Sequence, residues 1–81
     1  MKALVYVTLK KTVLDPQGAT IARALQGMGH PEITAVRQGK FFEIELEGIG
    51  AAEARPALEK IAEDVLSNPV IEEFRVELPE G

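Results

Sequence analysis

The chain lacks cysteine and tryptophan, and it has one histidine, one tyrosine and three phenylalanines among its 81 residues. Without cysteine, disulfides and thiolate metal ligands are excluded. No stretch has the roughly 18 uninterrupted apolar residues that a membrane-spanning helix needs, and the sequence after Met1 lacks the apolar region of a signal peptide. We therefore expect a soluble, cytoplasmic protein that does not enter a membrane.

Positive charge is also scarce. The net charge of −4 argues against a nucleic-acid-binding surface, which needs clustered lysine and arginine. The length allows a single domain, residues 1–81. A domain of this size buries only roughly 60% of the surface of its unfolded chain. Since 46% of the residues are hydrophobic, we expect a partner to cover part of the apolar surface.

The pattern of apolar residues predicts alternating strands and helices. Residues 3–9 alternate with period two, which is typical of a strand. Asp15 followed by Pro16 is typical of a helix start, because the carboxylate caps free N–H groups and proline fits the first helical position. The apolar stripe of this helix contains Ile21, Leu25 and Met28. Its end is predicted at residue 29, a glycine.

The middle of the sequence predicts a hairpin with its turn at residues 38–39. In this register Ala35 pairs with Phe42 and Ile33 with Ile44, which places these apolar side chains on one face. A second helix follows and ends near Asn68, and a last strand covers residues 73–78. The predicted fold is α+β, a two-layer βαββαβ sandwich with a four-stranded antiparallel sheet and two helices on one face.

The other face of this sheet is expected to be partly apolar. A face of this kind is a plausible oligomer interface, and we expect a homodimer or tetramer. The candidate self-association residues are Leu4, Tyr6, Val36 and Phe41.

No residue pattern predicts a catalytic, cofactor-binding or metal site in this chain. His30 is the only histidine, and no serine or paired carboxylates stand near it. Glu43, Glu45 and Glu47 share one face of a strand, where we expect them to be solvated or to pair with lysine or arginine of another subunit. The glycine-rich patterns that bind phosphates are absent.

Four stretches of the sequence resemble the PurS family, the small subunits of the bacterial and archaeal multi-subunit phosphoribosylformylglycinamidine synthase. The resemblance spans the whole chain, and the Asp-Pro-Gln-Gly and Asn-Pro-Val-Ile-Glu stretches are the most specific parts. The matching residues are Leu14-Asp15-Pro16-Gln17-Gly18, Leu25 with Gly29, Val36-Arg37-Gln38-Gly39-Lys40, and residues 66–74 from Leu66 to Phe74.

The resemblance implies a role in purine biosynthesis. The complex is an ATP- and glutamine-dependent C–N ligase that also uses Mg²⁺. A large synthetase subunit binds ATP, Mg²⁺ and the ribonucleotide, and a glutaminase subunit releases ammonia. The small subunit is not expected to be catalytic alone; it brings the other two together and supports ammonia transfer. The candidate partner-contact residues are Lys11, Asp15, Gln17, Arg37, Lys40, Asn68 and Glu72.

Two other classes of protein share the predicted element order. A sensing domain of the ACT type would bind an amino acid near the first strand–helix loop, which usually contains glycine, whereas residues 11–15 contain none. A small enzyme with a ferredoxin-like fold would need an acid–base pair, and the sequence offers no such pair.

Overall fold

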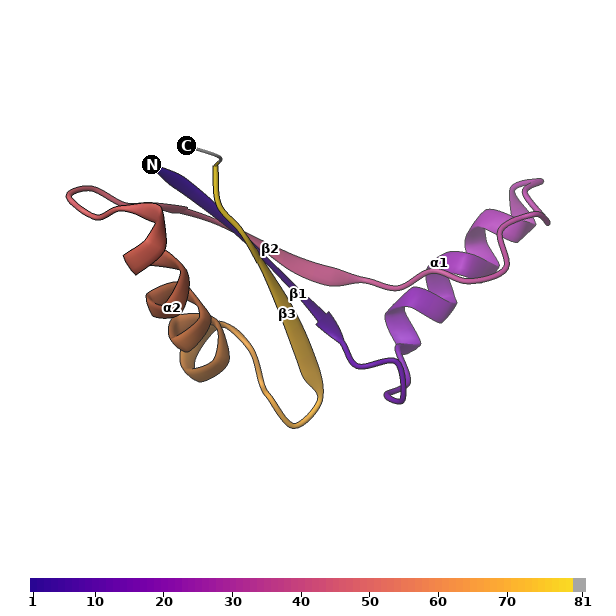
Figure 1. Cartoon of the computed structure of the whole chain (residues 1–81). Helices are drawn as coiled ribbons and strands as arrows, with labels where there is room; N and C mark the ends of the chain where they lie inside the picture. The colour runs from indigo at the N-terminus through magenta and orange to yellow at the C-terminus, as the bar shows by residue number, and fades with distance from the viewer. Residues whose placement is uncertain (80–81) are drawn as a thin grey trace.

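The chain folds into a three-stranded antiparallel sheet with one helix packed on it and a second helix held away from it (Figure 1). The computed structural model describes residues 1–79. The molecule is elongated, with principal extents of 50 × 27 × 14 Å. The elements are β1 (Lys2–Leu9), α1 (Pro16–Gly27), β2 (Gly39–Glu45), α2 (Ala51–Ile61), a single π-helical turn η1 (Ala62–Leu66), and β3 (Glu72–Glu77).

The central strand of the sheet is β1, and the strand order is β2-β1-β3. Val5 on β1 lies opposite Phe42 on β2 and Val76 on β3. Because side chains alternate along a strand, this register gathers the apolar residues of all three strands on one face. Because β1 is central, the outer edges of β2 and β3 have no neighbouring strand within residues 1–79.

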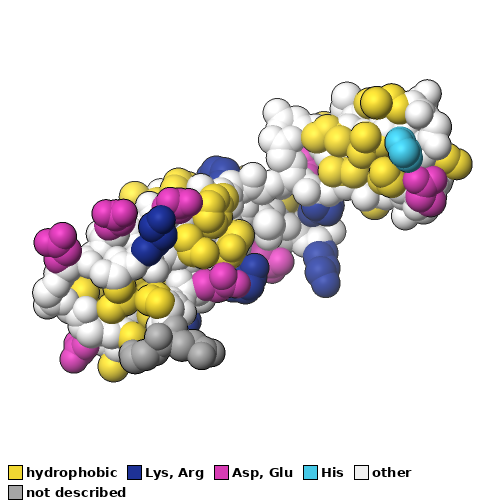
Figure 2. Space-filling model, turned by 90° about the horizontal axis from the view of Figure 1, so that it is seen from above, with side chains coloured by type: hydrophobic (Ala, Val, Ile, Leu, Met, Phe, Trp, Pro, Cys, Tyr) yellow, Lys and Arg dark blue, Asp and Glu magenta, His cyan; other side chains and the backbone are white. Residues whose placement is uncertain are grey.

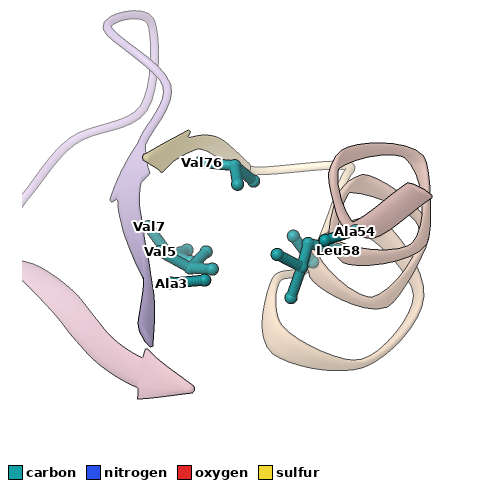
Figure 3. Close-up of a cluster of buried hydrophobic side chains, with 7 residues drawn as sticks. Ala3, Val5, Val7, Ala54, Leu58 and Val76 are labelled. Carbon is teal, nitrogen blue, oxygen red and sulfur yellow. The ribbon is translucent and has the colours of Figure 1, made fainter. Parts of the chain in front are cut away.

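The core lies between that face of the sheet and α2. Val5 and Val7 point toward Leu58, and all three side chains are fully buried (Figure 3). Phe42 and Phe74 pack around this cluster and are partly buried. The predicted inward faces of the first and last strands are therefore confirmed.

The predicted hairpin is wrong. Residues 33–38 form no strand, and β2 pairs with β1 instead, so that Ile44 lies opposite Ala3 rather than Ile33. The reason is that residues 33–38 run along α1. The side-chain amide of Gln26 donates a hydrogen bond to the Ile33 carbonyl at 2.8 Å, and the backbone N–H of Gln38 donates to the carboxylate of Asp15 at 2.8 Å. The sheet accordingly has three strands, and the predicted fourth strand is absent from residues 1–79.

The prediction that both helices cover one face of the sheet is also wrong. Figure 1 shows α2 on the sheet and α1 well beyond its end. Only Gly18 and Ala22 of α1 are buried, whereas Ile21 and Met28 of the predicted apolar stripe are exposed. We call residues 11–37, which contain α1 and its return segment, the arm.

The predicted ends of α1 are confirmed. Asp15 is its N-cap, and Pro16 is its first residue. Gly29 follows the helix with φ +100°, a conformation that favours glycine because it lacks a Cβ atom. The helix therefore has the bounds that local sequence predicts, although its surroundings differ.

Candidate functional site: the junction between the arm and the sheet

The arm joins the sheet at one place, where the chain leaves β1 and where it enters β2. We call this place the junction. A surface cavity of about 180 Å³ opens there, between the end of β1, the start of α1 and the starts of β2 and β3. Asp15, Gln17, Lys40 and Glu72, which are four of the candidate partner-contact residues, line it.

Asp15 connects the two chain segments of the junction. One carboxylate oxygen accepts a hydrogen bond from the N–H of Gly18 at 2.9 Å, which caps α1. The other oxygen accepts from the N–H of Gln38 at 2.8 Å, on the segment that returns to the sheet. These bonds, that of Gln38 first, lower the pKa of Asp15, because they stabilise its charged form. The positive charge of Arg37 acts in the same direction.

Arg37 makes a second connection between the same segments. Its guanidinium donates a hydrogen bond to the backbone carbonyl of Lys10 at 2.9 Å and lies 3.5 Å from that of Leu9. These two contacts place the positive charge of Arg37 at the end of β1. This geometry gives Arg37 a structural reason to be there that the sequence did not indicate.

Gly18 allows α1 and the return segment to approach closely. A Cβ atom on Gly18 would overlap the carbonyl oxygen of Val36. From the sequence, Gly18 was identified only as part of a family-like stretch, and its role in this close approach was not predicted. A glycine placed inside a helix is itself a signal of close backbone approach, and it could have been used.

Lys40, Asn68 and Glu72 form a linked group on the other side of the cavity. The ammonium of Lys40 lies 3.5 Å from a carboxylate oxygen of Glu72 and donates to the Leu66 carbonyl at 3.4 Å. The second carboxylate oxygen of Glu72 accepts from the N–H of Asn68 at 2.7 Å. The side chain of Asn68 in turn accepts from the N–H of Val70 at 3.1 Å. This group fixes the turn between η1 and β3.

The remaining candidate contact residues are Gln17 and Lys11. Both are exposed. Gln17 borders the junction cavity and also a shallow, more apolar depression beside Thr20 and Ile21. Whereas Asp15 and Gly18 serve the fold, Gln17 is presented to solvent at the mouth of both hollows. Its position suits a contact with another molecule.

The candidate self-association residues do not all share one surface. Leu4, Tyr6 and Phe41 lie on the outer face of the sheet, with the Tyr6 and Phe41 ring centroids 5.1 Å apart. The guanidinium of Arg75 lies 4.5 Å from the Tyr6 centroid, in cation–π contact. The predicted place of Val36 on this face is wrong, because Val36 belongs to the return segment of the arm.

The other titratable groups considered in the sequence are exposed. His30 lies beyond the end of α1, with its Nδ1 atom 3.1 Å from a carboxylate oxygen of Glu32. Glu43 lies on the outer face, 3.4 Å from the ammonium of Lys2. Among residues 1–79, no three acidic or histidine side chains are grouped so that they could hold a metal ion. Within the same residues, neither helix has the length and apolarity needed to span a membrane.

Comparison with known proteins gives matches over nearly the whole chain. A family model described as PurS, phosphoribosylformylglycinamidine (FGAM) synthase, matches residues 2–80. The phosphoribosylformylglycinamidine synthase subunit PurS of Mycobacterium leprae is 45% identical over 76 residues, which cover 93% of this chain and 91% of that protein.

Solved structures agree with the architecture as well. The structure of Bacillus subtilis PurS matches with a TM-score of 0.85 and 39% identity, covering 98% of both chains. A chain in the structure of PurLQS from Thermotoga maritima matches with a TM-score of 0.85 and 33% identity, covering 94% of this chain and 93% of that one. Because these matches include nearly all residues, they extend over the sheet and over the outlying arm.

Proposed function

The chain belongs to the PurS family of phosphoribosylformylglycinamidine synthase subunits, and we propose that it is the non-catalytic assembly subunit of such a synthase in purine biosynthesis. In this role it bridges a synthetase subunit and a glutaminase subunit in the cytoplasm and supports the transfer of ammonia between them. ATP, Mg²⁺ and glutamine are used by the other two subunits. The Thermotoga maritima relative, which belongs to a structure of PurLQS, supports the choice of partners.

The observation that carries this proposal is the elongated shape with two separate apolar surfaces. Figure 2 shows hydrophobic side chains gathered over the arm and, apart from them, over the body formed by the sheet and α2. On the arm, Leu14 and Met28 are 86% and 73% exposed. On the body, Phe41 of the outer sheet face is 52% exposed. Large exposed apolar patches mark interaction surfaces, and two of them at opposite ends suit a protein that binds two partners.

The junction lies between these surfaces, and we propose that it takes part in partner contact. Gln17 and Lys11 are exposed and available for direct contacts, and Lys40 is exposed while paired with Glu72. The remaining candidate residues shape the surface through bonds within the chain. They are Asp15, Arg37, Asn68 and Glu72.

Self-association is a further part of the proposal. We propose a homodimer, which can pair into a tetramer, with Leu4, Tyr6 and Phe41 of the outer sheet face in the interface. The rings of Tyr6 and Phe41, which are tilted by 35° to each other, give this face an apolar centre, and Lys2 and Glu43 lie beside it as an ion pair. An apolar centre with a charged rim is the usual make-up of a protein interface. Val36 would contribute only through the arm.

The test is a reconstitution assay with the synthetase and glutaminase subunits of the same organism. Glutamine-dependent formation of the amidine should require this protein. When ammonium salts replace glutamine, activity should depend on it far less, because the synthetase then needs no ammonia from the glutaminase. Full glutamine-dependent activity without this protein would reject the proposal.

The alternative function is an amino-acid sensing domain of the ACT type. It is favoured by one observation, the junction cavity next to the first strand–helix loop, which is lined by charged side chains. However, both oxygens of Asp15 already accept backbone hydrogen bonds, and Lys40 is paired with Glu72. Calorimetric titration of the isolated protein with amino acids distinguishes the two functions, since specific binding of one of them would favour the sensing domain.

A further inference from the structure

We propose that Asp15 and Arg37 form a clamp that fixes the orientation of the arm relative to the sheet. This clamp consists of the hydrogen bonds from the Gln38 N–H to the Asp15 carboxylate and from the Arg37 guanidinium to the Lys10 carbonyl. The inference concerns the isolated chain and does not depend on the identity of the partners.

The covalent connection between the arm and the sheet is narrow. The chain enters the arm after Lys10, whose backbone N–H donates a hydrogen bond to the carbonyl of Ile71 beside β3 at 2.8 Å. It leaves the arm at Gln38, next to Gly39, and Gly39 lies opposite Thr8 in the β1–β2 pair. The arm is therefore attached through two adjacent passages. Without further contacts, two adjacent passages would act as a hinge, since only a few backbone dihedral angles would set the direction of α1.

Apolar packing does not fix that direction. Within residues 1–79, α1 stands away from both the sheet and α2, and no apolar core joins it to them (Figure 1). The buried side chains of the core come from β1, β3, α2 and η1. Within a single chain, the orientation of the arm therefore depends on polar contacts at the junction.

Both residues of the clamp cross between the two passages. Asp15 accepts from Gln38, which is 23 residues later in the chain. Arg37 donates to Lys10, which is 27 residues earlier. Both bonds are donated by the returning passage, one to the carboxylate of Asp15 at the start of α1 and one to the carbonyl of Lys10, the residue after β1. Together they hold both passages together at more than one point, which restrains rotation as well as separation.

The arm itself is a single unit, so motion would concentrate at the junction. Gly18 lets the carbonyl of Val36 approach α1 closely, and Gln26 donates to the carbonyl of Ile33 at 2.8 Å. The return segment is thus attached to α1 near both of its ends. Loss of the clamp is expected to change the angle between two intact parts and to leave each part folded.

The experiment measures the distance between the arm and α2 by double electron–electron resonance in the full-length chain. Ala24 on α1 and Ala57 on α2 are both exposed, and the absence of native cysteine allows both to be changed to cysteine for spin labelling. Labelled protein is diluted with unlabelled protein, so that only distances within one chain are recorded. The clamp predicts a narrow distance distribution for the otherwise unchanged chain.

Asp15→Asn is the first test variant. Its single amide oxygen can still cap α1 through Gly18, but it cannot also accept the bond from Gln38. Arg37→Ala is the second and removes the other bond. In each variant the distance distribution should become roughly twice as wide, because one of the two hydrogen bonds that restrain the arm is lost while the rest of the fold is kept. Asp64→Asn, the same change at an exposed position on η1, is the control and should leave the width unchanged.

The proposal is overturned by a distribution of equal width in all four proteins or by a broad distribution in the unchanged chain. Circular dichroism of each variant gives a second readout. The helical and strand signals should be retained, since the core lies apart from the junction. Loss of those signals in both clamp variants would also overturn the proposal, because it would show that the two residues maintain the whole fold and not the orientation of the arm.

Discussion

The ammonium of Lys40 on β2 lies 3.5 Å from the carboxylate of Glu72 on β3, so an ion pair joins two strands that are not neighbours in the sheet. β1 lies between these strands. The side chain of Glu72 is only 14% exposed, and it also accepts a hydrogen bond from the backbone of Asn68. Charges that are partly buried and hydrogen-bonded contribute more than ordinary surface pairs.

Replacement of Glu72 by alanine is therefore expected to destabilise the protein. Glu72→Ala leaves the N–H of Asn68 and the ammonium of Lys40 without these partners, and the free energy of unfolding should fall by about 1–3 kcal/mol. Glu73→Ala is the matched control on the same strand, where the side chain is exposed, and it should cost less than about 0.5 kcal/mol. Urea denaturation measures both, and equal losses would contradict the assigned contacts.

Two glycines of α1 should respond to the same substitution with opposite sign. Gly18→Ala places a methyl group against the Val36 carbonyl and should lower the free energy of unfolding by about 1–3 kcal/mol. Gly27→Ala meets no atom within 4 Å and should raise it by about 0.5–1 kcal/mol, because alanine favours the helix. Thermal unfolding of the two variants is the measurement. If Gly18→Ala were neutral or stabilising, the close approach of α1 and the return segment would be refuted.

Local sequence signals predicted the parts of this fold that depend on neighbouring residues. The helix start at Asp15 and Pro16 and the left-handed Gly29 were predicted correctly, since capping and backbone conformation act within one turn. The inward face of β2, with Phe42 and Ile44, was also predicted correctly although its partner strand was wrong. A period of two defines the faces of a strand whichever strand lies beside it.

The arm could not be predicted in this way. Gln38 and Gly39 resemble a hairpin turn, but the N–H of Gln38 bonds to Asp15, which is distant in sequence. Gly39 is required for a different reason, since a Cβ atom there would lie 2.6 Å from the carbonyl oxygen of Val7. The apolar stripe of α1 was assigned to the sheet of the same chain because a helical pattern shows that a face is apolar, not what covers it.

The sequence predicted the location of the candidate contact residues better than the role of each one. Asp15, Gln17, Lys40 and Glu72 line one cavity, although they come from separate parts of the sequence. The sequence predicted Asp15 as a helix cap, but only the structure shows that its second carboxylate oxygen bonds to Gln38 and that Gln17 is exposed beside it. Whether these residues contact partners stays a prediction.

The contribution of Asp15 to stability should depend on pH. Its pKa is lowered in the folded protein, chiefly by the bond from Gln38, so its stabilising effect is complete above the ordinary value of 3.8 and is lost as the pH falls through the lowered value. The difference in unfolding free energy between the unchanged chain and Asp15→Asn should be constant near neutral pH and shrink on acidification. A difference that stays constant into the acid range would contradict the bond between Asp15 and Gln38.

Self-association should depend on the outer face of the sheet. Phe41→Glu places a charge at the aromatic pair with Tyr6 and should weaken the homodimer about tenfold or more. Val65→Glu introduces the same charge at an exposed position on η1, away from that face, and should have little effect. Sedimentation equilibrium at micromolar concentration measures both variants. A clean monomer of the unchanged chain would refute the proposed homodimer.

The most direct test of the assembly role is to measure the mass of the complex. The synthetase and glutaminase subunits are mixed with and without this protein in the presence of ATP, Mg²⁺ and glutamine, and the mixtures are analysed by size-exclusion chromatography with light scattering. The account predicts one complex containing all three proteins when the chain is present and separate subunits when it is absent. A complex of the other two that forms equally well without it, or a mixture in which this chain elutes apart, would contradict the account.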